Sequence, residues 1–238
     1  MAAAAPVTGW LTRLTLEGPG VAAMEEPGVA ASLRLLVPGS EGLLLPEWDG
    51  NEFLYADGSR PIIRTLTPLH RNGGRLDVDV VLHAGGPLAE WARGASPGDR
   101  AAVSGPGRPS APAPGAPAYA IFGDEAAVPA IGQVLECLVA AGPVEVAIET
   151  GHPGDPAPLP DRDDSTITWL PRGELPGTVL VEAAARAVLP AGGRVWAAGE
   201  AAAMHRIRGH LRDRGIPRTH ATVRGYWKYG KPSGAPGE

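Results

Sequence analysis

The chain has 238 residues and a formal net charge of −5, with 44 % hydrophobic and 20 % charged residues. This length allows one large domain or two small ones, and this composition excludes a disordered tail. No apolar run reaches the ~18 residues needed to span a bilayer, and the Ala-rich start Met1–Pro6 lacks the basic region of a signal peptide. A single cysteine, Cys137, excludes a disulfide framework and a cysteine-based metal site. We therefore expect a cytoplasmic protein with no membrane partner.

The first half of the chain has the alternation of apolar and polar residues that is typical of β-strands. We expect strands at Leu11–Leu16, Ser32–Val37 and Arg75–His83, separated by turns that contain Gly or Pro. A short helix is predicted at Pro87–Arg93, because Pro87 suits a first helical turn. Several short strands with regular turns favour a sandwich or a barrel.

A Pro-, Ala- and Gly-rich stretch at Gly105–Ala118 is typical of an extended linker, so we expect domains at residues 1–110 and 111–238. After the linker, strands alternate with helices, which predicts βαβ units on a parallel sheet. The predicted fold class is an antiparallel β-barrel followed by an open parallel α/β domain. The expected strands are Tyr119–Phe122, Val144–Glu149, Thr166–Leu170, Arg194–Ala198 and Ala221–Tyr226, and the expected helices are Val128–Leu138, Gly177–Val188 and Glu200–Arg214.

The charge is distributed unevenly along the chain. Between Met204 and Lys231, eight basic residues stand against Asp213 alone, whereas the rest of the chain carries 13 basic and 25 acidic residues. A basic end on an acidic protein can receive an anionic cofactor or substrate, and it can equally be a solvated helix face. Both interpretations stay open.

The common catalytic signatures are missing from the sequence. It has no nucleophile elbow, no P-loop and no G-x-G-x-x-G after a strand, and its six scattered histidines predict no metal site. Two turns remain in which a strand runs directly into a helix, at Gly123-Asp124-Glu125 and at Gly199-Glu200. A helix N-terminus favours a phosphate or a carboxylate, and ligands of open α/β sheets lie at the carboxyl ends of strands. We expect both turns to face one crevice, with ordinary helix entry as the alternative.

Four longer stretches combine into a more specific pattern, namely Trp48–Pro68, Leu76–Pro106, Ala120–Ile131 and Val195–Gly230. They contain the runs G-D-E-x-x-x-P-A-I, W-x-A-G-E and G-Y-W-K in that order. This pattern resembles the siderophore-interacting protein family, part of the ferredoxin-reductase-like superfamily. The resemblance implies an N-terminal β-barrel that holds FAD, a C-terminal domain that accepts NAD(P)H, and the reduction of a ferric siderophore.

The resemblance also implies cofactor-contact positions. Arg64 stands where it would pair with a pyrophosphate, and Thr67 stands where it would hydrogen-bond the flavin edge. The implied cofactor-binding residues are Arg64, Thr65, Leu66, Thr67, His83, Gly85, Gly86, Asp124, Glu125, Gly199, Glu200 and Trp227. Three basic residues, Arg206, Arg208 and Lys228, are expected to contact an anionic substrate. No catalytic residue is assigned.

Four positions on the cofactor side depart from the family pattern. Leu66 and Leu69 replace an aromatic residue and an arginine of the flavin motif, Ala89 replaces a serine, and Ala126 replaces a threonine. The lost stacking and the lost charge-assisted contact would weaken FAD binding, so that FAD is held loosely. The alternative is a family member whose cleft has been reused without flavin.

Three functions therefore stay open. The first is a reductase that passes electrons from NAD(P)H through FAD to a ferric siderophore. The second is a flavin-free cyclase or isomerase of small-molecule biosynthesis that holds an apolar intermediate. The third is a siderophore-binding module without catalysis. In each case the expected partner is a small molecule, and neither a nucleic acid nor a membrane.

Overall fold

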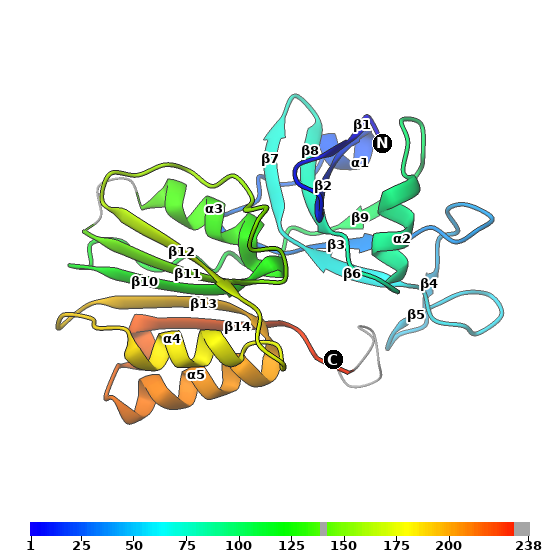
Figure 1. Cartoon of the computed structure of the whole chain (residues 1–238). Coiled ribbons are helices and arrows are strands. Elements are labelled where there is room, and N and C mark those ends of the chain that lie inside the picture. Colours follow the sequence, from blue (N-terminus) through cyan, green and yellow to red (C-terminus); the bar gives the residue numbers. More distant parts are fainter. Residues whose placement is uncertain (139–141, 231–238) are drawn as a thin grey trace. The chain divides into compact units, whose positions relative to one another are not determined.

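The computed structural model describes residues 1–138 and 142–230. The chain divides into two compact units, of which the first comprises Met1–Pro109 and the second begins at Ser110 (Figure 1). Within the described residues, no helix is both long enough and apolar enough to cross a membrane.

The first unit is built from short antiparallel strands. One sheet has the order β1-β2-β8-β7, with β1 (Ala3–Pro6), β2 (Leu11–Glu17), β8 (Arg75–Val81) and β7 (Pro68–Asn72). A second sheet has the order β6-β3-β9, with β6 (Ile63–Leu66), β3 (Leu33–Leu36) and β9 (Ala102–Ser104). The strands β4 (Glu47–Trp48) and β5 (Phe53–Leu54) form a separate hairpin. The helices of this unit are α1 (Pro19–Ala22) and α2 (Pro87–Gly94).

Both sheets of the first unit cover one hydrophobic core. Leu14 of β2, Leu35 of β3 and Val78 of β8 are fully buried in it, because alternate strand positions face the same side. The predicted antiparallel class is confirmed. Among the described residues, the hydrogen bonds form two sheets over this core and do not close them into one ring.

The second unit is an open parallel sheet with the order β12-β11-β10-β13-β14. Its strands are β10 (Tyr119–Asp124), β11 (Val144–Thr150), β12 (Ser165–Pro171), β13 (Arg194–Glu200) and β14 (Ala221–Trp227). Its helices are α3 (Val128–Cys137), entered through the 3-10 turn η1 (Glu125–Ala127), α4 (Thr178–Arg186) and α5 (Ala201–Asp213), with a second 3-10 turn η2 (Arg218–His220) before β14. Helix α3 covers one face of the sheet, and α4 and α5 cover the other (Figure 1). The expected βαβ architecture is confirmed.

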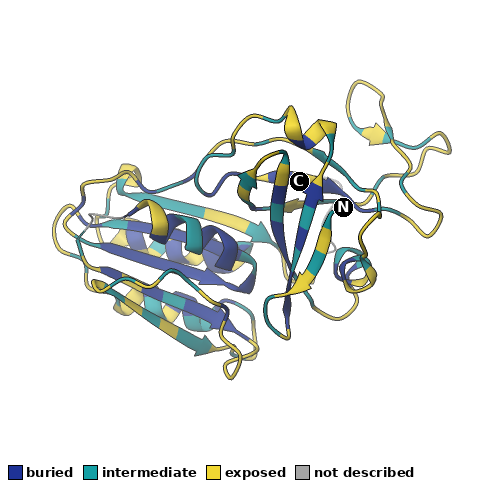
Figure 2. Ribbon diagram, turned by 90° about the horizontal axis from the view of Figure 1, so that it is seen from above, coloured by how far each residue is buried: buried dark blue, intermediate teal, exposed yellow. Residues whose placement is uncertain are grey.

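Burial in the second unit follows from this layering. Every residue of the central strand β10 is buried, since helices cover both of its faces. Phe122 of β10 packs with Leu180 of α4 and Ile207 of α5, and buried residues concentrate along the strands (Figure 2). The chain continues from β10 toward β11 on one side and returns to β13 on the other. The carboxyl ends of β10 and β13 therefore flank the switch point, where open α/β sheets bind their ligands.

The tight packing of β10 can be tested at a glycine. A Cβ at Gly123 would lie 2.7 Å from Ile131 Cδ1 and 2.8 Å from Ala127 Cβ. We expect Gly123→Ala to lower the free energy of unfolding by about 1–3 kcal/mol through overpacking, as measured by urea denaturation. Gly209 in α5 is the matched control, because a Cβ there meets no atom within 4 Å and alanine favours a helix. Equal effects of the two substitutions would contradict this packing.

Candidate functional site

The carboxyl ends of the parallel strands carry a group of buried carboxylates. Asp124, Glu125, Glu149 and Glu200 each expose at most 6 % of their surface. Acidic residues are almost never buried to this extent unless they are paired or hydrogen-bonded, so their partners define the site.

Asp124 connects the ends of three strands. Its Oδ1 accepts a hydrogen bond from the Ala126 N–H (3.0 Å), and its Oδ2 accepts from the Glu200 N–H (2.9 Å) and from the indole N–H of Trp227 (2.8 Å). Gly199 permits this approach, because its φ is 154° and a Cβ there would lie 2.5 Å from Asp124 Oδ2. The carboxylate therefore bridges the switch point between β10 and β13.

Burial raises the pKa of Asp124 to about 6, although the hydrogen bonds from Trp227, Ala126 and Glu200 act in the opposite direction. Desolvation disfavours the charged form, and three donors do not fully compensate for it. The ionised carboxylate therefore lowers the stability of the folded unit at neutral pH.

Two further carboxylates cap helices. The Oε2 of Glu200 accepts from the Ala203 N–H at the start of α5 (2.8 Å), and its Oε1 accepts from the Tyr229 N–H (3.3 Å). The Oε1 of Glu149, near the end of β11, accepts from the Gly177 N–H immediately before α4 (2.7 Å). With the Asp124 contact at η1, each of the three helix entries at this edge holds a carboxylate of the chain itself.

A second network surrounds Glu125. Its Oε1 accepts from Thr150 Oγ1 (2.8 Å), from the Gly151 N–H (2.8 Å) and from His152 Nδ1 (2.9 Å), and its Oε2 accepts from the Arg172 guanidinium (2.6 Å). Burial alone would raise the pKa of Glu125, but these donors outweigh burial and hold that pKa below its ordinary value. Glu125 is therefore a charged, fully engaged carboxylate.

Arg172 lies between two acidic residues. Its Nε is 3.7 Å from Glu149 Oε1, in addition to the bond with Glu125. Burial raises the pKa of Glu149, and its Oε2 has no hydrogen-bond partner among the described residues. The Arg172 charge is therefore balanced within the chain, which leaves little attraction for an anionic ligand at this position.

The predictions from sequence did not include Glu149, His152 or Arg172. A different signal is present here, because β11 runs through Glu149-Thr150 directly into a glycine turn at Gly151-His152 and not into a helix. Arg172 follows the end of β12 in the same way. A search for a glycine-containing turn after every predicted parallel strand would have identified this part of the site.

The implied flavin contacts lie in the first unit, on β6 and after it. Arg64 is half-buried in β6 and donates to the Ile63 carbonyl (2.9 Å), and the Thr67 side chain is buried. Thr65 between them is exposed. Leu66 packs against the hydrophobic core of the unit, so that its replacement of an aromatic residue does not by itself open an apolar chamber.

The loop before α2 leads to an open helix N-terminus. Gly85 has a φ of 73°, and a Cβ there would meet no atom within 4 Å. A Cβ at Gly86 would overlap the His83 ring, and Arg93 of α2 fixes this loop by donating to the His83 carbonyl (2.8 Å). The N-cap residue of α2 is Gly86, which supplies no side-chain cap, and the helix begins at Pro87. A helix start of this kind favours a phosphate group.

Two departures from the family pattern also fall on helix starts. Ala89 is buried in α2, where a serine hydroxyl would need a buried partner, and exposed Glu90 adds an acidic group to the same first turn. Ala126 supplies only its backbone N–H, to Asp124. Ala89 and Glu90 therefore weaken the match of the α2 start to a phosphate, whereas Ala126 has no part in that start.

The three basic residues expected to contact a substrate are all exposed. Arg208 donates to the Val223 carbonyl of β14 (2.8 Å), whereas Arg206 lies two positions earlier on α5 and hence on a different side of that helix. Lys228 directly follows β14. Arg206 and Arg208 therefore face different sides of α5, and the contact of all three residues with a substrate stays a prediction.

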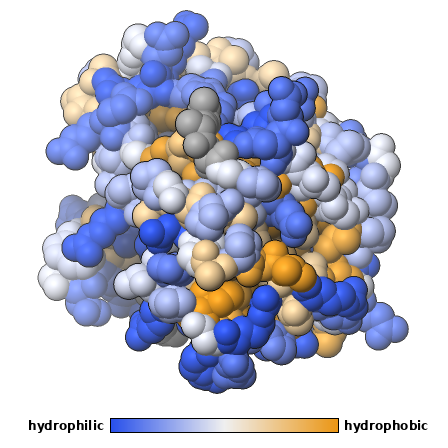
Figure 3. Space-filling view, turned by 90° about the vertical axis from the view of Figure 1, so that its left-hand side faces the viewer, coloured by the Kyte–Doolittle hydropathy of each residue, from blue (hydrophilic) through white to orange (hydrophobic). Residues whose placement is uncertain are grey.

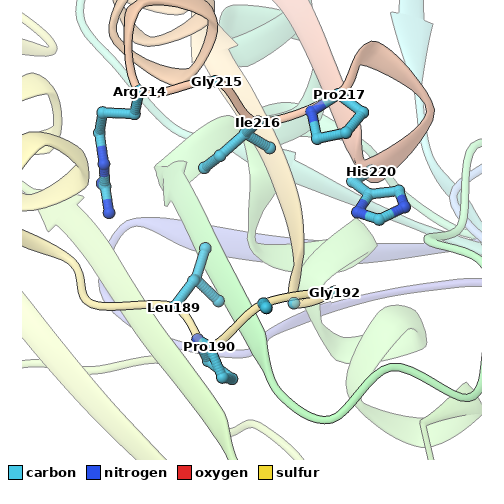
Figure 4. Close-up of a pocket in the computed structure, with 10 residues that line it drawn as sticks. Leu189, Pro190, Gly192, Arg214, Gly215, Ile216, Pro217 and His220 are labelled. Carbon is cyan, nitrogen blue, oxygen red and sulfur yellow. The ribbon is translucent and has the colours of Figure 1, made fainter.

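A pocket of about 230 Å³ lies at the opposite edge of the same sheet, where β13 and β14 begin. Leu189 and Ile216 are directed into it, with Arg214 on one side and His220 on the other (Figure 4). Arg214 is already committed to capping α4, since it donates to the carbonyls of Ala184 (3.2 Å) and Ala187 (2.7 Å). In a surface view of the molecule, small apolar patches lie between hydrophilic side chains (Figure 3), as on ordinary protein surfaces.

The antiparallel unit followed by an open parallel α/β unit is a ferredoxin-reductase-like fold. The same fold occurs in the ferredoxin reductase of carbazole 1,9a-dioxygenase, with a TM-score of 0.68 and 16 % identity over 94 % of this chain and 65 % of that one. Residues 1–110 match the siderophore-interacting FAD-binding domain, and residues 116–230 match the siderophore-interacting protein model. The chain belongs to the siderophore-interacting protein family, as its resemblance predicted.

Individual relatives agree with this assignment. An uncharacterized protein of Mycobacterium tuberculosis is 35 % identical over 189 residues, which cover 72 % of this chain and 67 % of the relative. The ferric vibriobactin reductase ViuB of Vibrio cholerae is 28 % identical over 194 residues, covering 78 % of this chain and 71 % of ViuB. A siderophore utilization protein from T. fusca has a TM-score of 0.80 and 30 % identity, covering 97 % of this chain and 91 % of that one.

The raised pKa of Asp124 predicts a specific pH dependence of stability. Because the folded pKa of about 6 exceeds the ordinary value of 3.8, folding binds a proton between these values. The contribution of Asp124 to stability is therefore fully present below pH ~4 and is lost as the pH rises through about 6. We expect Asp124→Asn to remove this loss, so that the variant gains about 1–3 kcal/mol relative to wild type between acidic and neutral pH.

Urea unfolding of both proteins across this pH range measures the effect. Asp213→Asn is the matched control, because the Asp213 side chain is 66 % exposed on the surface of the same unit. Parallel pH profiles of the wild type and Asp124→Asn would contradict the assignment.

Proposed function

We propose that this chain is a cytoplasmic, FAD-dependent reductase of ferric siderophores that draws its electrons from NAD(P)H. The observation that carries the proposal is the uncapped N-terminus of α2 behind Gly85 and Gly86, in a unit that matches a siderophore-interacting FAD-binding domain. The relationship to ViuB, which is described as a ferric vibriobactin reductase, supports the same substrate class.

FAD would supply the redox chemistry, since a flavin takes up two electrons and passes them on singly. The residues of the chain bind and orient it. The Arg64 guanidinium would pair with the pyrophosphate, the buried Thr67 hydroxyl would hydrogen-bond the flavin, and the first-turn N–H groups of α2 would hold a phosphate. Reduction of ferric to ferrous iron would then release the metal, because a siderophore holds ferrous iron far less tightly.

The second unit does not offer the same position to the phosphates of a nicotinamide nucleotide. At its helix entries, the backbone N–H groups of Ala126, Gly177 and Ala203 already donate hydrogen bonds to carboxylates of the chain. The donor nucleotide in this proposal therefore binds outside these three positions.

The flavin-free cyclase or isomerase is the weaker hypothesis. It requires apolar space where the flavin motif has lost its aromatic residue. Leu66 fills that position by packing on the core of the unit, so we do not propose this function.

The assignment of FAD to the first unit predicts that substitution of Arg64 selectively weakens FAD binding. We expect Arg64→Ala to weaken FAD binding by at least about tenfold, because a hydrogen bond to a charged group contributes about 1.5–3 kcal/mol. Flavin fluorescence quenching measures the affinity. Arg75→Ala is the control, since Arg75 is exposed on the same unit and pairs with exposed Glu17. Equal FAD affinity in all three proteins would remove Arg64 from the site.

The reductase activity can be tested without the nucleotide. The FAD-loaded protein is reduced with dithionite in the absence of oxygen and mixed with a ferric siderophore and a ferrous-iron chelator. We expect the oxidised flavin absorbance to return while the ferrous chelate forms. A flavin that stays reduced would contradict the proposed function.

A further inference from the structure

The α/β unit of this chain differs from a typical nucleotide-binding sheet at the ends of its strands. Such sheets place a phosphate at the N-terminus of a helix that follows a strand, where unpaired N–H groups and the helix dipole attract it. Here the helix entries at the carboxyl edge are occupied by the side chains of Asp124, Glu149 and Glu200.

We infer that Asp124, Glu149 and Glu200 are specificity-determining residues that fill the phosphate positions of the α/β unit and exclude nucleotide phosphates from its three helix N-termini. This inference rests on the proposed function, because it concerns how the electron donor binds. The carboxylates take the place that a phosphate would hold, and they carry the same sign of charge.

Their geometry makes them hard to displace. Asp124 holds the Glu200 N–H and the Trp227 indole as well as the η1 entry, so its release would break contacts to β13 and β14. Glu149 is fully buried, and Glu200 also accepts from the Tyr229 N–H beyond β14. A phosphate that replaced any of them would leave a buried carboxylate without its donors beside a second negative charge.

The first unit supplies the contrast within the same chain. The N-cap residue of α2, Gly86, supplies no side-chain cap, and a Cβ at Gly85 before it would meet no atom of the described residues within 4 Å. One helix start therefore accepts a phosphate while three others are closed, and inorganic pyrophosphate can distinguish them.

The test is a titration of the full-length, ¹⁵N-labelled protein with pyrophosphate, followed by amide chemical shifts. We expect the amides of Leu88 and Ala89 at the α2 start to shift. The amides of Ala126, Gly177 and Ala203 should stay unchanged in the wild type. Shifts of the latter three in the wild type would overturn the inference, whereas unresponsive α2 amides would count against the proposed flavin site instead.

A substitution should open one of the closed positions. Glu200→Ala removes the carboxylate from the Ala203 N–H, and we expect pyrophosphate to shift this amide with at least about tenfold higher affinity than in the wild type. Glu182→Ala is the matched control, because Glu182 is an exposed residue of α4 in an i,i+4 pair with Arg186. An Ala203 amide that stays unresponsive in folded Glu200→Ala would overturn the inference.

Two further variants keep the test decisive. Glu200→Gln retains an acceptor for the Ala203 N–H, so the position should stay closed although the charge is gone. If Glu200→Ala does not fold, Glu149→Ala opens the start of α4, and the Gly177 amide becomes the readout. If pyrophosphate bound at the Ala203 amide equally well in Glu200→Gln and Glu200→Ala, then occupancy of the helix start by a side chain would not be the reason that phosphate is excluded. This result would contradict the inference.

Discussion

The hydrogen bonds that Asp124 accepts cross the switch point between β10 and β13, where the strand order of the parallel sheet reverses. The arrangement of the carboxyl edge of the α/β unit depends on these bonds. One carboxylate joins the end of β10 to the start of α5 through the Glu200 N–H and to the end of β14 through Trp227. Gly199 is required for this contact, since any side chain there would collide with the carboxylate. The arrangement costs stability, because burial makes the negative charge unfavourable, and it lies at the switch point where such sheets usually bind a ligand.

The two units therefore use helix N-termini in opposite ways. In the β unit, a glycine loop leads to an uncapped helix, as expected for a phosphate-bearing cofactor. In the α/β unit, internal carboxylates satisfy the corresponding N–H groups, and Arg172 is balanced by Glu125 and Glu149. Under the proposed function, this division places the flavin in the first unit and leaves the donor nucleotide only contacts outside the helix starts.

Much of the fold could be predicted from local patterns. The alternation within Arg75–His83, the apolar run that became the buried strand β10, and the helix starts at Pro87 and Glu200 agree with the structure. The strands β1, β6, β7 and β9 were not predicted, because three to five residues are too few to display a period. Their pairing depends on partners distant in sequence, which a local pattern does not encode.

The site could be predicted only in part, for a related reason. The turns at Asp124 and Glu200 were expected to share an edge, and a hydrogen bond of 2.9 Å joins them. The direction of their side chains was not predictable, since a register shift between Gly199 and Glu200 re-aims Glu200 toward its own helix. Sequence indicated phosphate-binding turns, whereas the three-dimensional contacts fill those turns with carboxylates.

The indole N–H of Trp227 reports most directly on the central contact, because it donates to Asp124. Its NMR signal, assigned with Trp227→Phe, should shift with a midpoint near the Asp124 pKa of about 6, and this transition should vanish in Asp124→Asn. An indole signal that shows no transition between about pH 4 and about pH 8, or that is unchanged by Asp124→Asn, would contradict the account.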